Sequence, residues 1–400
     1  MGLFAAILAG GGATRLWPLS RRSRPKWRLR DLDRHDAGPV IDALQPKNAP
    51  PAAAVRRQSG RNGQPHTLLS QALDRAQALA GEHVAVITAS EQVDHVVEEF
   101  AGKKRAQILA EPMPRDTAGA VAFACAWALT QDADPDLIIL PGDATLESNA
   151  RFASLVKNGQ ALARTEHAIV TFGIKPKYPA TGFGYILAGE AASCGQGCRT
   201  VRQFVEKPSR ETALTYLKDG NYFWNAGIFL WRVRDVLKEF ARQLPAHATA
   251  IEAMVPVLKA HPPGPDGRPD PAAQAELLPL FQSMTKISFD FGIMEHAAKV
   301  GVVPVELAWD DVGSYSALAA HIPENVQGNR STQLTYTVDA EGCTVITGPT
   351  SMKKIVALVG VNDLTVVETP DALVVIKSQR DQDIKHVVER LREHGLLDFL

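Results

Sequence analysis

Short apolar runs separated by helical patterns are the feature that most constrains the fold of this 400-residue chain. Four runs have the length and unbroken apolar character of strands buried on both faces: FAAILAG (4–10), VAVIT (84–88), LIILPGD (137–143) and AIVTFGI (168–174). Helical patterns lie between these runs, at 67–80, 94–103 and 116–130. Strands that alternate with helices predict right-handed crossovers, and therefore an α/β protein with an open, mostly parallel sheet and helices on both faces.

A run of three glycines, Gly10, Gly11 and Gly12, follows the first of these strands. In open α/β sheets ligands bind beyond the carboxyl ends of the strands, and both this loop and Asp143 fall there. The loop is not a Rossmann fingerprint, because Arg15 stands in place of the final glycine, and no GK[ST] follows to make a Walker A loop. A glycine cluster alone is more often a tight turn than a phosphate site.

Two cations that follow the glycines favour phosphate binding over a simple turn. Glycines let backbone N–H groups come within hydrogen-bond distance of a polyphosphate. Arg15 offers a planar fork for phosphate oxygens, and Lys26 offers a point charge. Because Pro18 and Pro25 restrict the segment between them, they would preset the approach of the lysine.

Composition indicates an ordinary globular protein, with 45% hydrophobic and 22% charged residues. A formal net charge of -1 gives no indication of binding to nucleic acid or to a membrane surface. No apolar run reaches the roughly 18 residues that span a bilayer, and the N-terminus lacks the basic region of a signal peptide. Four cysteines fit a reducing cytoplasm, where we expect the protein to reside.

Two regions depart from the alternating pattern. Residues 31–66 hold many breakers and no Phe, Trp or Tyr, so we expect a flexible insertion there. Beyond about residue 330, short β-rich runs predict a separate β unit, of which a short solenoid is one form. An amphipathic helix closes the chain, and we expect its apolar face to carry Ile384, Val387, Val388 and Leu391. We therefore divide the chain into domains at 1–325 and 326–400.

Motifs in order along nearly the whole chain resemble those of one family. The segment GGGATRLWPLSRRSRPK resembles the signature GGxGTRLxPLT…PK of sugar-1-phosphate nucleotidylyltransferases. The further matches are EPMPRDTAGAV (111–121), LPGD (140–143), FGIKPKYPATGFGYI (172–186), FVEKP (204–208), YFWNAGIFLWR (222–232), SFDFGIMEH (288–296) and WDDVGSYSAL (309–318). The tryptophan and the PLSR continuation are similar to the mannose-1-phosphate guanylyltransferase branch. That branch implies a Rossmann-like core followed by a small left-handed β-helix.

The resemblance also implies a reaction, in which GTP and mannose 1-phosphate give GDP-mannose and pyrophosphate with Mg²⁺. Asp143 and Asp311 resemble the metal-binding aspartates of the family, and they would converge at one strand edge. Adjacent Asp310 would point elsewhere. Arg15 and Lys26 would hold the triphosphate and stabilise the charge on the leaving pyrophosphate. The less favoured alternative for Asp143 is an aspartate that caps a loop.

Further residues match the binding positions of the family. For the nucleotide they are Gly10, Gly11, Gly12, Glu111 and Asp116. For the sugar phosphate they are Gly182, Gly184, Glu206, Lys207 and Asn225. In these roles the carboxylate accepts from sugar hydroxyls, the amide both accepts and donates, and the lysine pairs with phosphate.

Departures from the family pattern keep other functions open. The family usually has Asn where this chain has Asp116, PKQFL where it has PKWRL, and His where it has Ala144. The first alternative is the same reaction with another NTP or another hexose or heptose 1-phosphate. The second is an inactive homologue that binds a sugar nucleotide and regulates a partner. The β unit and closing helix also allow a homo-oligomer.

Overall fold

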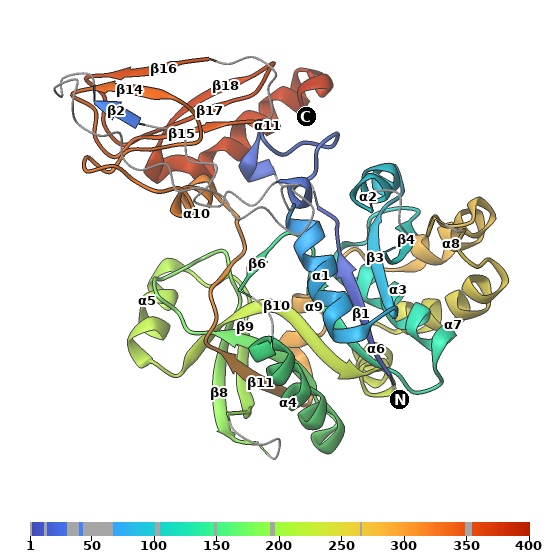
Figure 1. Cartoon of the computed structure of the whole chain (residues 1–400). Helices are drawn as coiled ribbons and strands as arrows, with labels where there is room; N and C mark the ends of the chain where they lie inside the picture. The colour runs from blue at the N-terminus through green and yellow to red at the C-terminus, as the bar shows by residue number, and fades with distance from the viewer. Residues whose placement is uncertain are drawn as a thin grey trace. The chain divides into compact units, whose positions relative to one another are not determined.

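A computed structural model describes residues 2–11, 14–29, 40–42, 67–100, 105–147, 150–192, 197–264, 266–348 and 354–400. The chain forms two compact units (Figure 1). The first, here called the sheet unit, comprises Met1–Gly10, Ser70–Gly142 and Leu146–Trp309. The second, the solenoid unit, comprises Gly11–Leu69, Asp143–Thr145 and Asp310–Leu400. The two units are discontinuous in sequence, because the solenoid unit also takes in the chain just after the first strand.

The sheet unit is built on a nine-stranded sheet of order β4-β3-β1-β5-β10-β7-β11-β9-β8. Its strands are β1 (Leu3–Leu8), β3 (Val84–Ala89), β4 (Gln107–Glu111), β5 (Asp136–Pro141), β7 (Ile169–Ile174), β8 (Tyr185–Ala191), β9 (Arg199–Val205), β10 (Tyr222–Arg232) and β11 (Val300–Val305). The neighbours β4, β3, β1 and β5 are parallel, as the alternating pattern predicts. Beyond them β10 runs antiparallel to both β5 and β7, so the sheet as a whole is mixed.

Helices lie on both faces of the sheet (Figure 1). The helices of the sheet unit are α2 (Val93–Glu99), α3 (Asp116–Gln131), α4 (Ala150–Glu166), α5 (Arg210–Asp219), α6 (Val233–Gln243), α7 (Pro245–Ala260), α8 (Pro271–Ser283) and α9 (Phe289–Gly292), and α1 (Leu68–Ala80) enters the unit at Ser70. α3 is buried along its alanine-rich length from Ala118 to Ala128, because small side chains let it pack closely against the sheet on one side and α7 on the other. None of the described helices is long and apolar enough to cross a membrane.

The carboxyl ends of β1 and β5 lie side by side. Leu8 pairs with Pro141, and the Gly142 N–H donates to the Leu8 carbonyl at 2.9 Å. A Cβ atom at Gly142 would lie 2.9 Å from the same oxygen, so this position requires glycine. The glycine loop after β1 and the segment leading to Asp143 therefore leave the sheet at one edge, as expected for a ligand-binding edge.

The solenoid unit stacks short strands in parallel. One sheet has the order β13 (Arg330–Ser331), β15 (Thr344–Thr347), β17 (Leu364–Glu368), β18 (Leu373–Lys377), and the other has the order β16 (Val356–Val359), β14 (Thr335–Val338), β2 (Val40–Asp42). All pairings are parallel except β17 with β18. Buried Asn329 ties successive turns together, since its side chain donates to the Ala340 carbonyl and accepts from the Cys343 N–H.

Two expectations for the solenoid unit need correction. Residues 40–42, inside the predicted insertion 31–66, form β2, whose backbone pairs with β14; the rest of 31–66 lies outside the described residues. In the closing helix α11 (Ile384–Glu393), Ile384 and Val388 are buried, but Val387 is 43% exposed. The apolar stripe of the helix is therefore narrower than predicted.

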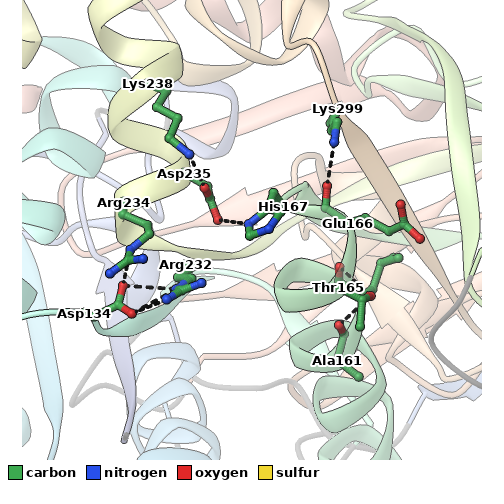
Figure 2. Close-up of polar contacts among 11 residues, drawn as sticks. Asp134, Ala161, Thr165, Glu166, His167, Arg232, Arg234, Asp235, Lys238 and Lys299 are labelled. Carbon is green, nitrogen blue, oxygen red and sulfur yellow. Dashed lines mark hydrogen bonds and ion pairs between the residues drawn. The ribbon is translucent and has the colours of Figure 1, made fainter.

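A charged cluster occupies the edge of the sheet opposite to Gly142. Asp134, just before β5, bonds to Arg232 and Arg234, while Asp235 accepts from Lys238 and lies 3.2 Å from His167 Nδ1 (Figure 2). The hydrogen bond from Arg232 is the largest cause that lowers the pKa of Asp134. Arg232 pairs in register with the first residue of β5, so the cluster fastens β10 to β5.

Replacing Asp134 by asparagine is expected to lower the urea midpoint of unfolding at pH 7. A carboxyl group whose pKa is lowered by folding stabilises the protein above its unfolded pKa of about 3.9, and this stabilisation is lost as pH falls through the folded value. The difference from the parent protein should therefore shrink below about pH 4. Urea titrations at pH 7 and pH 3 test this, and a difference that is equal at both pH values contradicts it.

Candidate active site

Lys26 and two aspartates meet in the solenoid unit. Lys26 begins a short 3-10 helix directly after Pro25, whose φ of −61° and ψ of 157° are those of extended backbone. Its Nζ donates to Asp143 Oδ2 at 2.9 Å and to the backbone carbonyl of Asp311. Its side chain is only 12% exposed. The structure thus gives the lysine two oxygen partners, so its ammonium is engaged by protein oxygens rather than open to a triphosphate.

The WDDVG segment shapes the surroundings of Asp311. Asp310 accepts from the Val312 N–H at 2.7 Å and lies 3.6 Å from His321 Nε2, whereas Asp311 accepts from the Gly313 N–H at 3.1 Å. Asp310 is therefore occupied by other partners. A Cβ atom at Gly313 would lie 2.5 Å from Asp311 Oδ2, so a larger residue there would displace this carboxylate.

Val312, the residue after Asp311, has a strained backbone with φ of +48°. Such a conformation is a genuine outlier for a β-branched residue, and it persists only where the surroundings enforce it. Here Val312 is buried in a cluster that also contains Trp17 and Tyr315. The Tyr315 hydroxyl donates to the Trp17 carbonyl at 2.6 Å, which ties the segment after the glycine loop to the segment after Asp311. Strain of this kind is common at functional sites.

The charges in this cluster suit a divalent cation. Burial raises the pKa of Asp311, the Lys26 ammonium opposes this rise, and the negative charges of Asp310 and Asp143 add to it. Within the described residues, no group of three or more His, Cys, Asp and Glu side chains is placed to hold a metal by itself. Mg²⁺ usually takes only one or two carboxylates and completes its shell with water and substrate phosphates. Asp143 and Asp311 fit that pattern.

The glycine loop itself is open. Gly11 has a φ of +100°, and a Cβ atom at Gly10 or Gly11 would meet nothing within 4 Å. Gly12 lies outside the described residues. Arg15 lies in the 3-10 helix Thr14–Leu16, is exposed, and has no hydrogen bond or ion pair within the described part of the chain. Its guanidinium fork is therefore available to a ligand.

A second cluster lies in the sheet unit, where β9 ends. Glu206 and Lys207 pair at 2.6 Å, and the glutamate side chain is 8% exposed while the lysine is 49% exposed. Lys207 has a φ of +48°, a conformation that non-glycine residues seldom adopt, and its N–H donates to the Phe183 carbonyl. The Glu206 N–H donates to Glu295 Oε1 at 3.1 Å.

Asn225 and Gly184 belong to the same cluster. The Asn225 N–H donates to the Gly184 carbonyl at 2.8 Å. A Cβ atom at Gly184 would lie 2.6 Å from Glu206 Oε2 and 3.4 Å from Asn225 Cβ. Gly182 lies two residues earlier in the same loop and is half-buried. The structure therefore brings together four predicted sugar residues, Gly184, Glu206, Lys207 and Asn225.

Sequence reasoning missed the residues that support this second cluster. Asp290 Oδ1 accepts from Asn225 Nδ2 at 2.9 Å, and Thr171 Oγ1 donates to Asn225 Oδ1 at the same distance. Asp290 stands in the SFDFGIMEH motif, which signalled the family without signalling its role. Thr171 lies inside a buried strand, where a single threonine gives no functional signal.

The nucleotide-binding candidates Glu111 and Asp116 lie on either side of the turn between β4 and α3. Burial, and then the negative charges of Asp116 and Glu91, raise the pKa of Glu111 to about 8. Glu111 Oε1 is enclosed and has no hydrogen-bond partner among the described residues. Asp116 is exposed, has a φ of +61°, and accepts from the Thr117 N–H. Asparagine also adopts this conformation readily, so the family residue would fit the same backbone.

The chain combines a mixed sheet covered by helices, a glycine loop after β1 and a parallel β-solenoid. This combination is the architecture of a nucleotidyltransferase. The chain belongs to the nucleotidyl transferase family, whose model matches residues 61–327. A second model, the MannoseP isomerase/GMP-like beta-helix domain, matches residues 335–391.

Relatives and a solved structure resemble the chain over nearly its whole length. Xanthan biosynthesis protein XanB of Xanthomonas campestris is 34% identical over 97% of this chain and 73% of its own length. Mannose-1-phosphate guanylyltransferase of Escherichia coli is 32% identical over 99% of this chain and 75% of its own. A crystal structure described as mannose-1-phosphate geranyltransferase from Thermus thermophilus is 28% identical, with a TM-score of 0.76, and covers 98% of this chain and 100% of its own.

Proposed function

We propose that the protein is a Mg²⁺-dependent mannose-1-phosphate guanylyltransferase, which transfers GMP from GTP to mannose 1-phosphate and releases pyrophosphate. The names of the curated relatives support the substrates. The observation that carries the proposal is the cluster of Lys26, Asp143 and Asp311, since phosphoryl transfer requires positioning and charge neutralisation and little covalent chemistry.

In the proposed reaction, a phosphate oxygen of the sugar phosphate attacks the α-phosphorus of GTP in line, and the bond to the pyrophosphate oxygen breaks. Asp143 and Asp311 would hold Mg²⁺, which neutralises charge on the phosphates when bound. Arg15 would bind phosphate oxygens through its guanidinium fork, with the backbone of Gly10, Gly11 and Gly12 alongside. Lys26 would exchange its carboxylate and carbonyl partners for phosphate oxygens.

At the sugar end, Glu206 would accept from hydroxyl groups and Asn225 would bond to them through its amide. Lys207, which is half exposed beside Glu206, would pair with the sugar phosphate. At the base, guanine presents two N–H donors and the O6 acceptor. Glu111 would face the donors, and a proton on its carboxyl group would also let it donate. Asp116 would lie beside it.

A second candidate function is the same transfer with another NTP or another hexose or heptose 1-phosphate. Asp116 favours it, because an ionised carboxylate cannot donate to O6 as the family's asparagine amide can. An inactive, regulatory sugar-nucleotide-binding homologue is the remaining alternative. We further propose that the protein resides in the cytoplasm and forms homo-oligomers.

A substrate matrix tests the proposal. Purified protein is given each of GTP, ATP, UTP, CTP and dTTP with each of several hexose and heptose 1-phosphates and Mg²⁺, and pyrophosphate release is recorded. The highest kcat/KM is expected for GTP with mannose 1-phosphate. A preference for a different pair supports the second candidate, and tight binding of GDP-mannose without any turnover supports the inactive homologue.

Replacing Gly184 by alanine is expected to raise the KM for mannose 1-phosphate by about tenfold. This is the change expected when one hydrogen bond to the substrate, that of Glu206, is lost. The new methyl group would lie 2.6 Å from Glu206 Oε2, and the flexible carboxylate would have to move away. The KM for GTP should not change. Gly2→Ala is the matched control, because its Cβ atom would meet no atom closer than 3.8 Å. An unaltered KM for the sugar phosphate in Gly184→Ala contradicts the role of Glu206.

A further inference from the structure

The side-chain amide of Asn225 is held by three hydrogen bonds within the sheet unit. Its Oδ1 accepts from Thr171 Oγ1 at 2.9 Å and from the Gly227 N–H at 3.2 Å. Its Nδ2 donates to Asp290 Oδ1 at 2.9 Å. A carbonyl oxygen has two lone pairs and an NH₂ group has two protons. Both lone pairs of Oδ1 are therefore used, and one N–H of Nδ2 remains.

The arrangement excludes the flipped amide. Turning the amide around would place its NH₂ group against the Gly227 N–H, and its oxygen against the acceptor oxygen of Asp290. Both contacts would be repulsive. Gly227 has a φ of +68° in the irregular stretch of β10 that follows Asn225, so its N–H is aimed by the backbone and does not adjust freely.

The two partner side chains are themselves fixed. Thr171 is fully buried in β7, where its hydroxyl also lies 3.3 Å from the Ile228 carbonyl. Asp290 lies in α9, whose first residue, Phe289, donates its N–H to Thr117 Oγ1 of α3 at 2.8 Å. Burial, and then the negative charge of Glu206, raise the pKa of Asp290.

From this geometry we infer that Thr171 and Asp290 are positioning residues that make Asn225 a donor-only contact for a sugar hydroxyl group. The inference rests on the proposed function and specifies how its sugar subsite recognises the substrate. Neither residue touches the substrate; each acts through the Asn225 amide.

If Asn225 can only donate, the direction of its hydrogen bond to the sugar hydroxyl group is fixed. The hydroxyl oxygen accepts from Asn225 Nδ2, which leaves its proton to donate. We take Glu206 Oε2 as its acceptor, because this oxygen and Asn225 Cβ lie 2.6 Å and 3.4 Å from the Cβ position at Gly184. A sugar without this hydroxyl would leave both protein groups unpaired, and a site built in this way discriminates strongly against such analogues.

The test uses two pairs of variants of the full chain. Thr171→Val keeps the shape of the side chain and removes its hydroxyl, and Thr171→Ser is the matched control that keeps the hydroxyl. Asp290→Leu removes the acceptor, and Asp290→Asn keeps an acceptor oxygen of the same shape. For each variant, the KM for mannose 1-phosphate, the KM for GTP and the midpoint of thermal unfolding are measured. Calorimetry supplies the Kd of mannose 1-phosphate.

We expect Thr171→Val and Asp290→Leu to raise the KM and Kd of mannose 1-phosphate about tenfold, with the KM for GTP within about twofold of the parent value. Thr171→Ser and Asp290→Asn should stay within about threefold for both substrates. A panel of 2-, 3-, 4- and 6-deoxy mannose 1-phosphates adds a readout that a merely structural role would not move. For one of these analogues, the affinity should be about tenfold lower than that for mannose 1-phosphate in the parent protein. The difference should be much smaller in Thr171→Val and Asp290→Leu.

The outcomes separate this inference from the proposed function. Two results overturn the inference and leave the proposed reaction standing. One is an equal loss of affinity for every analogue in every variant. The other is an unchanged affinity for mannose 1-phosphate in both Thr171→Val and Asp290→Leu. Binding of mannose 1-phosphate without turnover overturns the reaction, and the Kd values then decide the inference. A parent protein that binds no sugar 1-phosphate overturns both.

Discussion

Asp311→Asn is expected to lower kcat by about a thousandfold, the scale of losing a key electrostatic contact in phosphoryl transfer. Asparagine keeps the size of the side chain and the oxygen that accepts from the Gly313 N–H at 3.1 Å. The substitution therefore removes charge and leaves the local structure in place. A neutral amide is a poor ligand for Mg²⁺, so the Mg²⁺ concentration that gives half-maximal rate should rise as well.

Asp310→Asn is the matched control for this prediction. Its oxygens face the Val312 N–H and His321, so the same chemical change one residue away should leave kcat within about fivefold of the parent value. Initial rates with saturating GTP and mannose 1-phosphate over a Mg²⁺ titration measure both variants. If Asp310→Asn were the more damaging change, the assignment of Asp311 as the metal ligand would be wrong.

The sequence predicted the part of the fold that local patterns encode. Unbroken apolar runs predicted β1, β3 and β5, and the loops after Leu8 and Pro141 do leave one edge of the sheet. The direction of a strand cannot be predicted in this way. A run such as YFWNAGIFLWR has the same local pattern whether its strand is parallel or antiparallel to its neighbours. The antiparallel β10 follows from its pairing with β8, a contact distant in sequence.

Long-range pairing also explains what was missed at 40–42 and at the closing helix. β2 is three residues long and pairs in parallel with β14, almost 300 positions later, so no local signal reveals it. Val387 matches the spacing of an apolar face, but Ile384, Val388 and the partly buried Leu391 are the residues of this helix that pack against the core of the solenoid unit. Periodicity defines a possible face, and packing decides how wide it is.

Within the candidate site, motifs identified the residues that carry charge and missed those that hold other residues in place. Lys26, Asp143 and Asp311 come from three separate motifs and meet in the structure. Their pattern was detectable because it combines a glycine loop, a strand end and the order of the family motifs. Thr171 could not be identified in this way, since its hydroxyl acts on Asn225 from a neighbouring strand.

Lys26→Met is expected to lower kcat/KM for GTP and to raise the affinity for Mg²⁺. The kcat/KM for GTP should fall by about 100- to 1,000-fold, because a cation that neutralises the phosphates is lost while the length of the side chain is kept. The affinity of the protein for Mg²⁺ without nucleotide should rise instead. In the structure the Lys26 ammonium bonds to Asp143 Oδ2 and to the Asp311 backbone carbonyl, so removing it takes away a positive charge that acts on both carboxylates.

Arg22→Met is the matched control, since Arg22 is exposed in the same segment and its loss removes the same charge. Its kcat/KM for GTP should stay within about twofold, as expected for an exposed surface charge. Steady-state rates measure the first effect, and calorimetric titration of Mg²⁺ measures the second. Unchanged Mg²⁺ affinity in Lys26→Met would mean that the lysine does not compete for the oxygens of this cluster. A small effect on kcat/KM would remove Lys26 from the catalytic residues, because a group that takes the charge of a triphosphate cannot be lost without slowing the transfer.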